Sequence, residues 1–157
     1  MIKVLIAGEG GQGVQVMAEI LARAAFLERK KALYIPNFGV EQRGGVSLAF
    51  VVIDDKPVVY PKFAKADILA VLADRSWERV KDYLGEQTKV IKGPALEGGE
   101  KSNFPSKAWN VVVLGKINKI GRVVLQENLI KALELRFAKQ FEKKPELKEL
   151  DLKALNQ

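Results

Sequence analysis

Two glycine-rich turns near the start of the chain constrain its fold more than any other feature. The first is Gly8-Glu9-Gly10-Gly11-Gln12-Gly13, and the second is Asn37-Phe38-Gly39-Val40-Glu41-Gln42-Arg43-Gly44-Gly45. Glycine is needed where the backbone takes a positive φ, or where a ligand or another backbone approaches closely. Each turn follows a strand-like apolar run, so we expect both at one end of a sheet, where open α/β folds place ligands and partners.

The pattern of apolar residues predicts alternating strands and helices. Strands are expected at residues 2–7, 33–35, 46–53, 58–60, 66–72 and 88–91, and helices at 14–29, 76–84 and 125–141. The first two strands and their helix form a βαβ unit, which predicts a parallel pair. The turn at 54–57 predicts a hairpin with 58–60, and Ser76 is the expected N-cap of the second helix. Residues 110–120 could form a strand or a helix. Their three consecutive valines favour a strand, whereas the length of the segment and the spacing of Leu114 and Ile117 permit a helix.

These elements predict a three-layer, Rossmann-like α/β domain with a mixed sheet, open or barrel-like. The 157 residues suit one domain, with an α/β core at 1–92, a loop at 93–107 and C-terminal helices at 108–157. The apolar runs are too short to span a membrane, and Met1-Ile2-Lys3 leads directly into a strand, so no signal peptide is expected. We therefore expect a cytoplasmic location.

The chain contains no cysteine and no histidine. Without cysteine it forms no disulfide and ligates no iron–sulfur cluster through its own thiolates. Without histidine it lacks a common metal ligand and the base of a Ser-His-Asp triad. Any chemistry run by this chain alone would therefore have to use carboxylates, lysine, arginine, tyrosine or hydroxyl groups, and we expect no metal site.

The chain is basic, because 26 Lys and Arg against 19 Asp and Glu give a net charge of +7. That balance suits nucleic acid, an acidic protein or a phosphate-bearing cofactor. The lysines are spread out, with short doublets at Lys30-Lys31 and Lys143-Lys144, and no basic stripe alternates with aromatic residues. Direct binding of nucleic acid is therefore disfavoured.

The first turn matches G-x-G-x-x-G through Gly8, Gly10 and Gly13. Between a strand and a helix, this motif is typical of a phosphate held at a helix N-terminus. A dinucleotide site also needs a carboxylate at the end of the second strand, where this chain has Ile35-Pro36-Asn37. A tight turn used for packing or partner contact is therefore favoured over an NAD(P) site, and a different phosphate-bearing ligand stays open.

The second turn carries the charged triplet Glu41-Gln42-Arg43 between glycines. Arg43 could hold a carboxylate or phosphate through two hydrogen bonds while Glu41 orients it. The alternative is a solvated ion pair of little energetic value. Because loops often carry binding residues, we favour recognition. Weaker candidates are Tyr34, Tyr60, Asp54-Asp55, Asp67 and Asp74-Arg75.

Several of these segments occur together in one family. They are Gly-x-Gly-Gly-Gln-Gly-Val at the first turn, the helix containing Met17-Ala18-Glu19-Ile20-Leu21, and Pro-x-Phe-Gly-x-Glu-x-Arg-Gly-Gly at the second turn. The pattern continues at Ala49-Phe50, Asp54-Asp55-Lys56-Pro57-Val58, Ala66-Asp67-Ile68 and Asn110-Val111-Val112-Val113-Leu114-Gly115. The chain thus resembles the gamma subunit of 2-oxoacid:ferredoxin oxidoreductases, of the pyruvate/ketoisovalerate family. In that family the last segment begins a helix, which favours a helix at 110–120.

The resemblance implies a parent enzyme that oxidatively cleaves a 2-oxoacid to an acyl-CoA, carbon dioxide and reduced ferredoxin. It implies alpha, beta and delta-type subunits as partners and ferredoxin through the complex, with no nucleic acid and no membrane. Thiamine diphosphate and the iron–sulfur clusters belong on those partners, coenzyme A is shared with them, and this chain alone is expected to bind none of these and to be inactive. It would assist assembly and closure over coenzyme A. The expected cofactor-binding or interface residues are Gly8, Gly10, Gly11, Gln12, Gly13, Gly39, Glu41, Gln42, Arg43, Gly44 and Gly45.

The 2-oxoacid itself is less constrained by the resemblance. Many pyruvate-type members have Arg-Gly-Ala-Pro where this chain has Arg43-Gly44-Gly45-Val46. The Gly-Gly form is more familiar in the 2-oxoglutarate and indolepyruvate types, whereas Phe38-Gly39-Val40-Glu41 and Asp54-Asp55-Lys56-Pro57 favour pyruvate or branched-chain acids. Pyruvate is our first expectation. A free-standing nucleotide-binding regulator that uses the first turn, and a basic nucleic-acid-binding module, are the alternatives.

Overall fold

The computed structural model describes residues 1–38, 44–60 and 62–157 and contains a five-stranded mixed sheet with the strand order β2-β3-β1-β4-β5. The strands are β1 (Ile2–Glu9), β2 (Lys31–Phe38), β3 (Val46–Asp54), β4 (Ile68–Val71) and β5 (Lys89–Lys92). The helices are α1 (Val14–Leu27), α2 (Asp74–Val80), α3 (Trp109–Gly121), α4 (Gln126–Arg136), α5 (Ala138–Lys143) and α6 (Pro145–Leu155). Short 3₁₀ turns lie at Lys81–Tyr83 and Ser106–Ala108.

The central strand is β1, which pairs antiparallel with β3 and parallel with β4. Its residues Val4, Leu5, Ile6 and Ala7 are fully buried, because helices cover both faces of the sheet, and this explains why β1 is an uninterrupted apolar run. The outer strands β2 and β5 do not pair with each other. The predicted mixed α/β fold is therefore confirmed, with an open sheet rather than a barrel.

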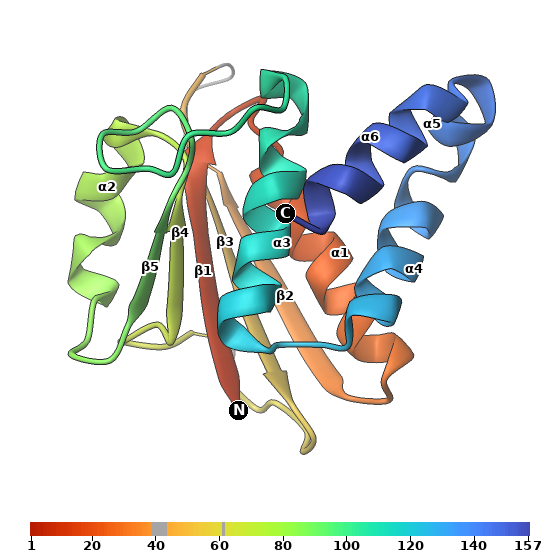
Figure 1. Cartoon of the computed structure of the whole chain (residues 1–157). Coiled ribbons are helices and arrows are strands. Elements are labelled where there is room, and N and C mark those ends of the chain that lie inside the picture. Colours follow the sequence, from red (N-terminus) through yellow and green to blue (C-terminus); the bar gives the residue numbers. More distant parts are fainter. Residues whose placement is uncertain (39–43, 61) are drawn as a thin grey trace.

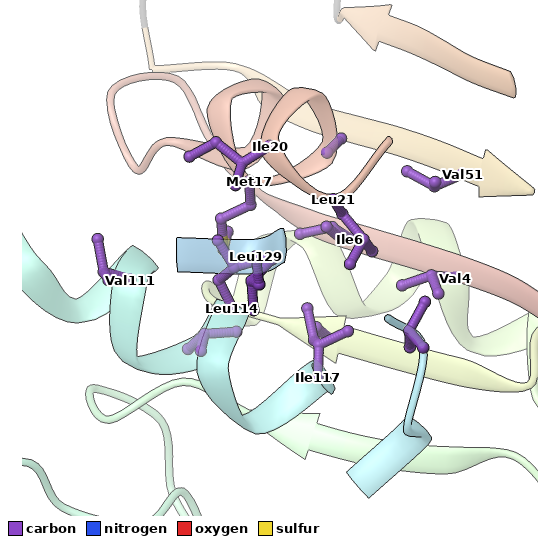
Figure 2. Packing of buried hydrophobic residues seen from close by; sticks show 14 of the residues in the cluster. Val4, Ile6, Met17, Ile20, Leu21, Val51, Val111, Leu114, Ile117 and Leu129 are labelled. Carbon is purple, nitrogen blue, oxygen red and sulfur yellow. The ribbon is translucent and has the colours of Figure 1, made fainter. Parts of the chain in front are cut away.

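The helices form two unequal layers around the sheet (Figure 1). Helices α1 and α3 pack against one face, α4 packs on α1, and α6 packs on α3. The larger core lies on this side, where Ile6 of β1, Leu21 of α1 and Leu114 of α3 are fully buried (Figure 2). On the opposite face, α2 and the aromatic contacts of Phe50 with Phe63 and Tyr83 close a smaller core.

The predicted parallel direction of the first two strands is confirmed, because β3 lies between β1 and β2 and is antiparallel to both. The predicted hairpin of 46–53 with 58–60 is wrong, because both sides of β3 are already occupied by β1 and β2. Residues 58–60 therefore lie outside the sheet, and the second glycine turn connects β2 to β3.

The predicted helices are present, but their ends and their number differ from the prediction. Residues 109–121 form a helix, as the family resemblance favoured. Helix α2 begins at Asp74, so Ser76 is not an N-cap; its hydroxyl donates to the carbonyl of Ala73 instead. The helix predicted at 125–141 is two helices, which meet at Phe137. No helix in the described ranges has the length and apolar character that a membrane crossing requires.

The C-terminal helix α6 packs closely on α3 because a glycine lies at their contact. A Cβ atom added at Gly115 would lie 2.2 Å from the carbonyl oxygen of Leu155, far inside any real carbon–oxygen contact. This close approach fixes the end of α6 against the middle of α3, and α3 in turn supplies one side of the candidate site.

Candidate functional site at the glycine-loop edge

The two glycine turns lie at the same end of the sheet, where β1 ends and β3 begins (Figure 1, top). We call this end the glycine-loop edge and define it as residues 8–13, 44–45, 72–75, 93–95 and 106–110. The prediction that both turns share one sheet end is confirmed for residues 8–13, 44 and 45. Four predicted site residues, Gly39, Glu41, Gln42 and Arg43, lie outside the described residues.

The first turn is held together by its own glutamine. The side-chain oxygen of Gln12 accepts a hydrogen bond from the backbone N–H of Glu9 at 2.8 Å. Its amide nitrogen donates to the carbonyl of Leu72, just beyond β4, at 3.4 Å. A Cβ atom on Gly8 would lie 2.7 Å from that same side-chain oxygen. Gln12 therefore shapes the turn and links it to β4.

Gly13 is required at the start of α1 for two reasons. Its φ of +76° is in the left-handed region, which other residues adopt only at a cost. An added Cβ would also lie 2.4 Å from the side-chain nitrogen of Asn110 and 3.1 Å from its Cβ. The absence of a side chain at Gly13 thus lets the first turns of α1 and α3 come together.

The second turn is tied to the first by a backbone hydrogen bond. The N–H of Gly10 donates to the carbonyl of Gly45 at 3.0 Å. The guanidinium of Arg75, at the start of α2, lies 3.8 Å from the carboxylate of Glu9 and donates to the carbonyl of Gly44 at 3.3 Å. Arg75 thus contacts both turns, so the weak sequence candidate Asp74-Arg75 does lie at this edge.

A crevice of about 190 Å³ opens beside the first turn. It is lined by Gly11, Gln12, Leu72, Gly93, Pro94, Ala95, Ser106, Trp109 and Asn110. The crevice lies between the carboxyl ends of β1 and β4, from which the chain continues to helices on opposite faces of the sheet. Such a topological switch point is where open α/β sheets bind their ligands.

The electrostatic character of the crevice comes mainly from helix ends. Both α1 and α3 begin beside it, and within the described residues neither has a side-chain cap or an acidic residue in its first turn. The partial positive charges of both helix N-termini therefore favour an anionic group there. In the described part of the chain, no cluster of three or more potential metal-ligating residues is present.

The two tyrosine candidates have different surroundings and do not come together. The Tyr34 hydroxyl donates to the side-chain oxygen of Gln15, whose nitrogen donates to the hydroxyl of Ser47 at 2.8 Å. Burial, with the nearby charge of Glu19, raises the pKa of Tyr34, so Tyr34 is a neutral structural link between β2 and α1. Tyr60 is exposed and belongs to the segment after β3.

Several lining residues were not among the site residues predicted from the sequence. Trp109 and Asn110 reach the crevice only because α3, almost a hundred residues after the first turn, packs beside α1. Leu72 and Gly93 follow β4 and β5, and the parallel pairing of β1 with β4 and of β4 with β5 brings them to the same edge as the first turn. Two signals were available: the Gly-Pro pair after a predicted strand at 93–94, and Asn110 at the start of a segment shared with the family.

Comparison with known proteins identifies the family. A family model described as pyruvate ferredoxin/flavodoxin oxidoreductase matches residues 3–157. Because this match covers nearly the whole chain, the chain belongs to that family. The predicted resemblance to an oxidoreductase subunit of this class is confirmed.

Two curated relatives cover most of the chain and differ in the 2-oxoacid that their names give. The pyruvate synthase subunit PorC of Methanothermobacter thermautotrophicus is 52% identical over 159 residues, covering 87% of this chain and 86% of its own. The 2-oxoglutarate synthase subunit KorC of Methanocaldococcus jannaschii is 32% identical over 152 residues, covering 83% and 81%.

Solved structures share the fold. The gamma subunit of a keto/oxoacid ferredoxin oxidoreductase from Geobacter sulfurreducens has a TM-score of 0.78 at 24% identity and covers 99% of this chain and 94% of its own. A 2-oxoglutarate:ferredoxin oxidoreductase from Magnetococcus marinus, solved with 2-oxoglutarate, coenzyme A and succinyl-CoA bound, has a TM-score of 0.84 at 19% identity. The second comparison covers 99% of this chain and 30% of the longer Magnetococcus marinus chain.

Proposed function

We propose that this chain is the non-cluster gamma subunit of a thiamine-diphosphate-dependent pyruvate:ferredoxin oxidoreductase, and that its glycine-loop edge forms one wall of the coenzyme A site. The single observation that carries this proposal is the crevice between β1 and β4, which the first turn and the start of α3 line. Membership of the oxidoreductase family supplies the class of reaction.

The crevice fits part of coenzyme A rather than all of it. Ligand sites usually measure roughly 300–1,000 Å³, whereas this crevice holds about 190 Å³, so a second subunit must complete the site. The backbone N–H groups at the starts of α1 and α3, with Ser106 and Asn110, would hold an anionic or polar part of the molecule. Leu72, Pro94 and Ala95 supply apolar contact. When bound, coenzyme A provides the thiol that accepts the acyl group.

The chain has no cysteine with which to ligate an iron–sulfur cluster. Thiamine diphosphate and the iron–sulfur clusters would therefore belong to alpha, beta and delta-type partner subunits, and ferredoxin would meet the complex through them. Pyruvate is the proposed 2-oxoacid because the pyruvate synthase relative is 52% identical to this chain and the 2-oxoglutarate synthase relative 32%. The two glycine turns would assist assembly and closure over coenzyme A, in the cytoplasm.

A free-standing nucleotide-binding module has less support. In a dinucleotide-binding unit the second parallel strand lies beside the first, so that its carboxylate reaches the ribose. Here β3 separates β2 from β1. The end of β2 carries Asn37 and Phe38 and no carboxylate.

The test uses the complex reconstituted from this chain and its partner subunits. We expect Arg43→Ala and Asn110→Ala each to leave the complex assembled at high protein concentration and to raise the KM for coenzyme A about tenfold, a loss equivalent to one well-made polar contact. Lys139→Ala, an exposed change on α5, is the control. Unchanged turnover of both variants at sub-saturating coenzyme A would overturn the proposal.

A further inference from the structure

The sheet end opposite the glycine-loop edge has a different character. Here β1, β2, β4 and β5 begin, β3 ends, and the N-terminus lies (Figure 1, bottom). Residues 55–60 and 62–67, between β3 and β4, lie along this end. We call this end the lysine edge and define it by Met1, Lys3, Lys31, Lys56, Val59, Tyr60, Lys62 and Lys65.

Three apolar side chains at the lysine edge are largely exposed to solvent. Val59 is 93% exposed, Tyr60 72% and Met1 64%. Val59 and Tyr60 cannot pair with β3 as a further strand of the sheet, because β3 already has β2 on one side and β1 on the other. Adjacent exposed apolar residues inside a polar rim mark an interaction site rather than ordinary surface variation.

The rim of these apolar residues is basic. Lys31, Lys56, Lys62 and Lys65 are exposed. The nearby carboxylates are mostly engaged within the chain: Asp54 accepts from the N–H groups of Asp55 and Lys56 and lies 3.8 Å from the N-terminal ammonium. Asp67 accepts from the N–H of Lys3 at 2.7 Å. Asp55, Asp67 and Asp82 are exposed as well, and the ammonium of Lys65 donates to the backbone carbonyl of Asp82 at 3.0 Å.

An apolar centre with a lysine rim is complementary to an apolar patch ringed by carboxylates. Nucleic acid is a poorer match, because the exposed side chains of Met1 and Val59 are aliphatic and offer no aromatic face on which a base could stack. The lysine edge also faces away from the glycine-loop edge, so both can be occupied at once.

We infer that the lysine edge docks onto an acidic, apolar-centred protein surface on another subunit of the oxidoreductase. This rests on the proposed function for the presence of a multi-subunit complex. It adds a second interface at the other end of the sheet, so that this chain bridges two surfaces of the assembly. Tyr60 is the expected anchor, because a partly apolar aromatic side chain with a hydroxyl suits the centre of such a contact.

Cross-linking of the assembled complex with a zero-length carbodiimide tests this directly, because that reagent joins lysine only to a carboxylate in contact with it. After digestion and mass spectrometry we expect Lys56, Lys62 and Lys65 to be joined to Asp or Glu residues of a different subunit. In an assembled complex, the absence of such links, or links only to a second copy of this chain or to ferredoxin, would overturn the inference.

A charge-reversal series gives the independent measurement. Lys56→Glu/Lys62→Glu/Lys65→Glu should weaken binding of this chain to the remaining subunits at least about tenfold, with the difference shrinking as salt is raised. The matched control, Lys139→Glu/Lys143→Glu/Lys144→Glu, makes the same charge change at exposed positions and should change binding less than about threefold. Equal effects of the two triples would reject a local contact.

The apolar part has its own variant, Val59→Ser/Tyr60→Ser, which leaves the charge unchanged and should also weaken binding about tenfold. Salt-dependent retention of DNA that the edge triple abolishes would assign the surface to nucleic acid instead. A chain that never joins an oxidoreductase complex contradicts the proposed function, whereas an assembled complex with a freely modified lysine edge contradicts only this inference.

Discussion

The two ends of the sheet differ in whether backbone contacts or exposed side chains define them. At the glycine-loop edge the backbones of two turns approach within a hydrogen bond, Gly10 to Gly45, and side chains such as Gln12 are used inside the turn. At the lysine edge the exposed groups are side chains, including Val59 and Tyr60, which are 93% and 72% exposed. One end is therefore specified by backbone shape and the other by surface chemistry.

This difference determines how each end responds to substitution. A side chain added at the glycine-loop edge has to displace neighbouring atoms or adopt a strained φ, so folding itself is affected. A side chain removed from the lysine edge takes away surface that only a partner would contact. We expect large stability effects at the first end and binding effects without stability effects at the second.

The largest stability effect is expected for Gly13→Ala. The new Cβ combines an unfavourable positive φ with the contact to Asn110, and together they should lower the free energy of unfolding by about 3 kcal/mol. Gly11→Ala is the matched control, since its φ is +92° but no atom of the described residues lies within 4 Å of the added Cβ. Chemical denaturation should show Gly11→Ala losing about 1 kcal/mol. Equal losses would mean that the approach of α1 and α3 is not tight.

A smaller loss is expected for Glu28→Gln, near the lysine edge. Glu28 accepts a hydrogen bond from the backbone N–H of Leu125 and lies 2.8 Å from the Lys30 ammonium. Loss of its negative charge should therefore lower the free energy of unfolding by about 1–2 kcal/mol. Burial alone would raise the pKa of Glu28, but the Lys30 and Leu125 hydrogen bonds outweigh it and hold this pKa below its ordinary value of 4.5.

The sign of the pH dependence follows from that lowered pKa. The stabilisation by Glu28 is fully present when the pH is above the pKa that Glu28 has in the unfolded chain. It is lost as the pH falls through the pKa that Glu28 has in the folded chain. The difference between the native chain and Glu28→Gln should therefore narrow below about pH 4.5. Denaturation curves at pH 7 and at pH 3.5 measure it, and a constant difference would exclude an ionised Glu28 as the cause.

Arg75→Ala should have a weaker effect on global stability, below about 1 kcal/mol, because the guanidinium is largely exposed. Its effect should be local instead. Hydrogen exchange of the Gly10 amide, which donates to Gly45, should become faster when Arg75 no longer contacts Glu9 and Gly44. Arg75→Lys retains the charge but not the planar guanidinium, so the exchange rate of its Gly10 amide should lie between those of the native chain and Arg75→Ala. Unchanged exchange at Gly10 would mean that Arg75 does not hold the turns together.

The smallest effect on folding is expected for Val59→Ser/Tyr60→Ser. Because both side chains are largely exposed, the free energy of unfolding should change by no more than about 0.5 kcal/mol. Thermal or chemical unfolding of the isolated chain measures it. A loss of several kcal/mol would show that these residues pack within the chain and are not a docking surface.

The sequence pattern predicted local features better than long-range ones. The strand before the first turn, the helix after it and the start of β5 depend on residues close together in the chain, and their predictions agree with the structure. The insertion of β3 between β1 and β2 could not be predicted, because strand order depends on contacts between distant segments. For the same reason Asn110 and Leu72 were missed, although the first turn that they contact was found.

The central claim is that the glycine-loop edge forms part of the coenzyme A site while the lysine edge does not. Hydrogen–deuterium exchange of the assembled complex, with and without coenzyme A, tests it most directly. We predict that coenzyme A slows exchange in peptides covering 8–16 and 106–113 and leaves peptides covering 55–67 unchanged. Protection of 55–67, or no change at 8–16 under saturating coenzyme A, would contradict the account.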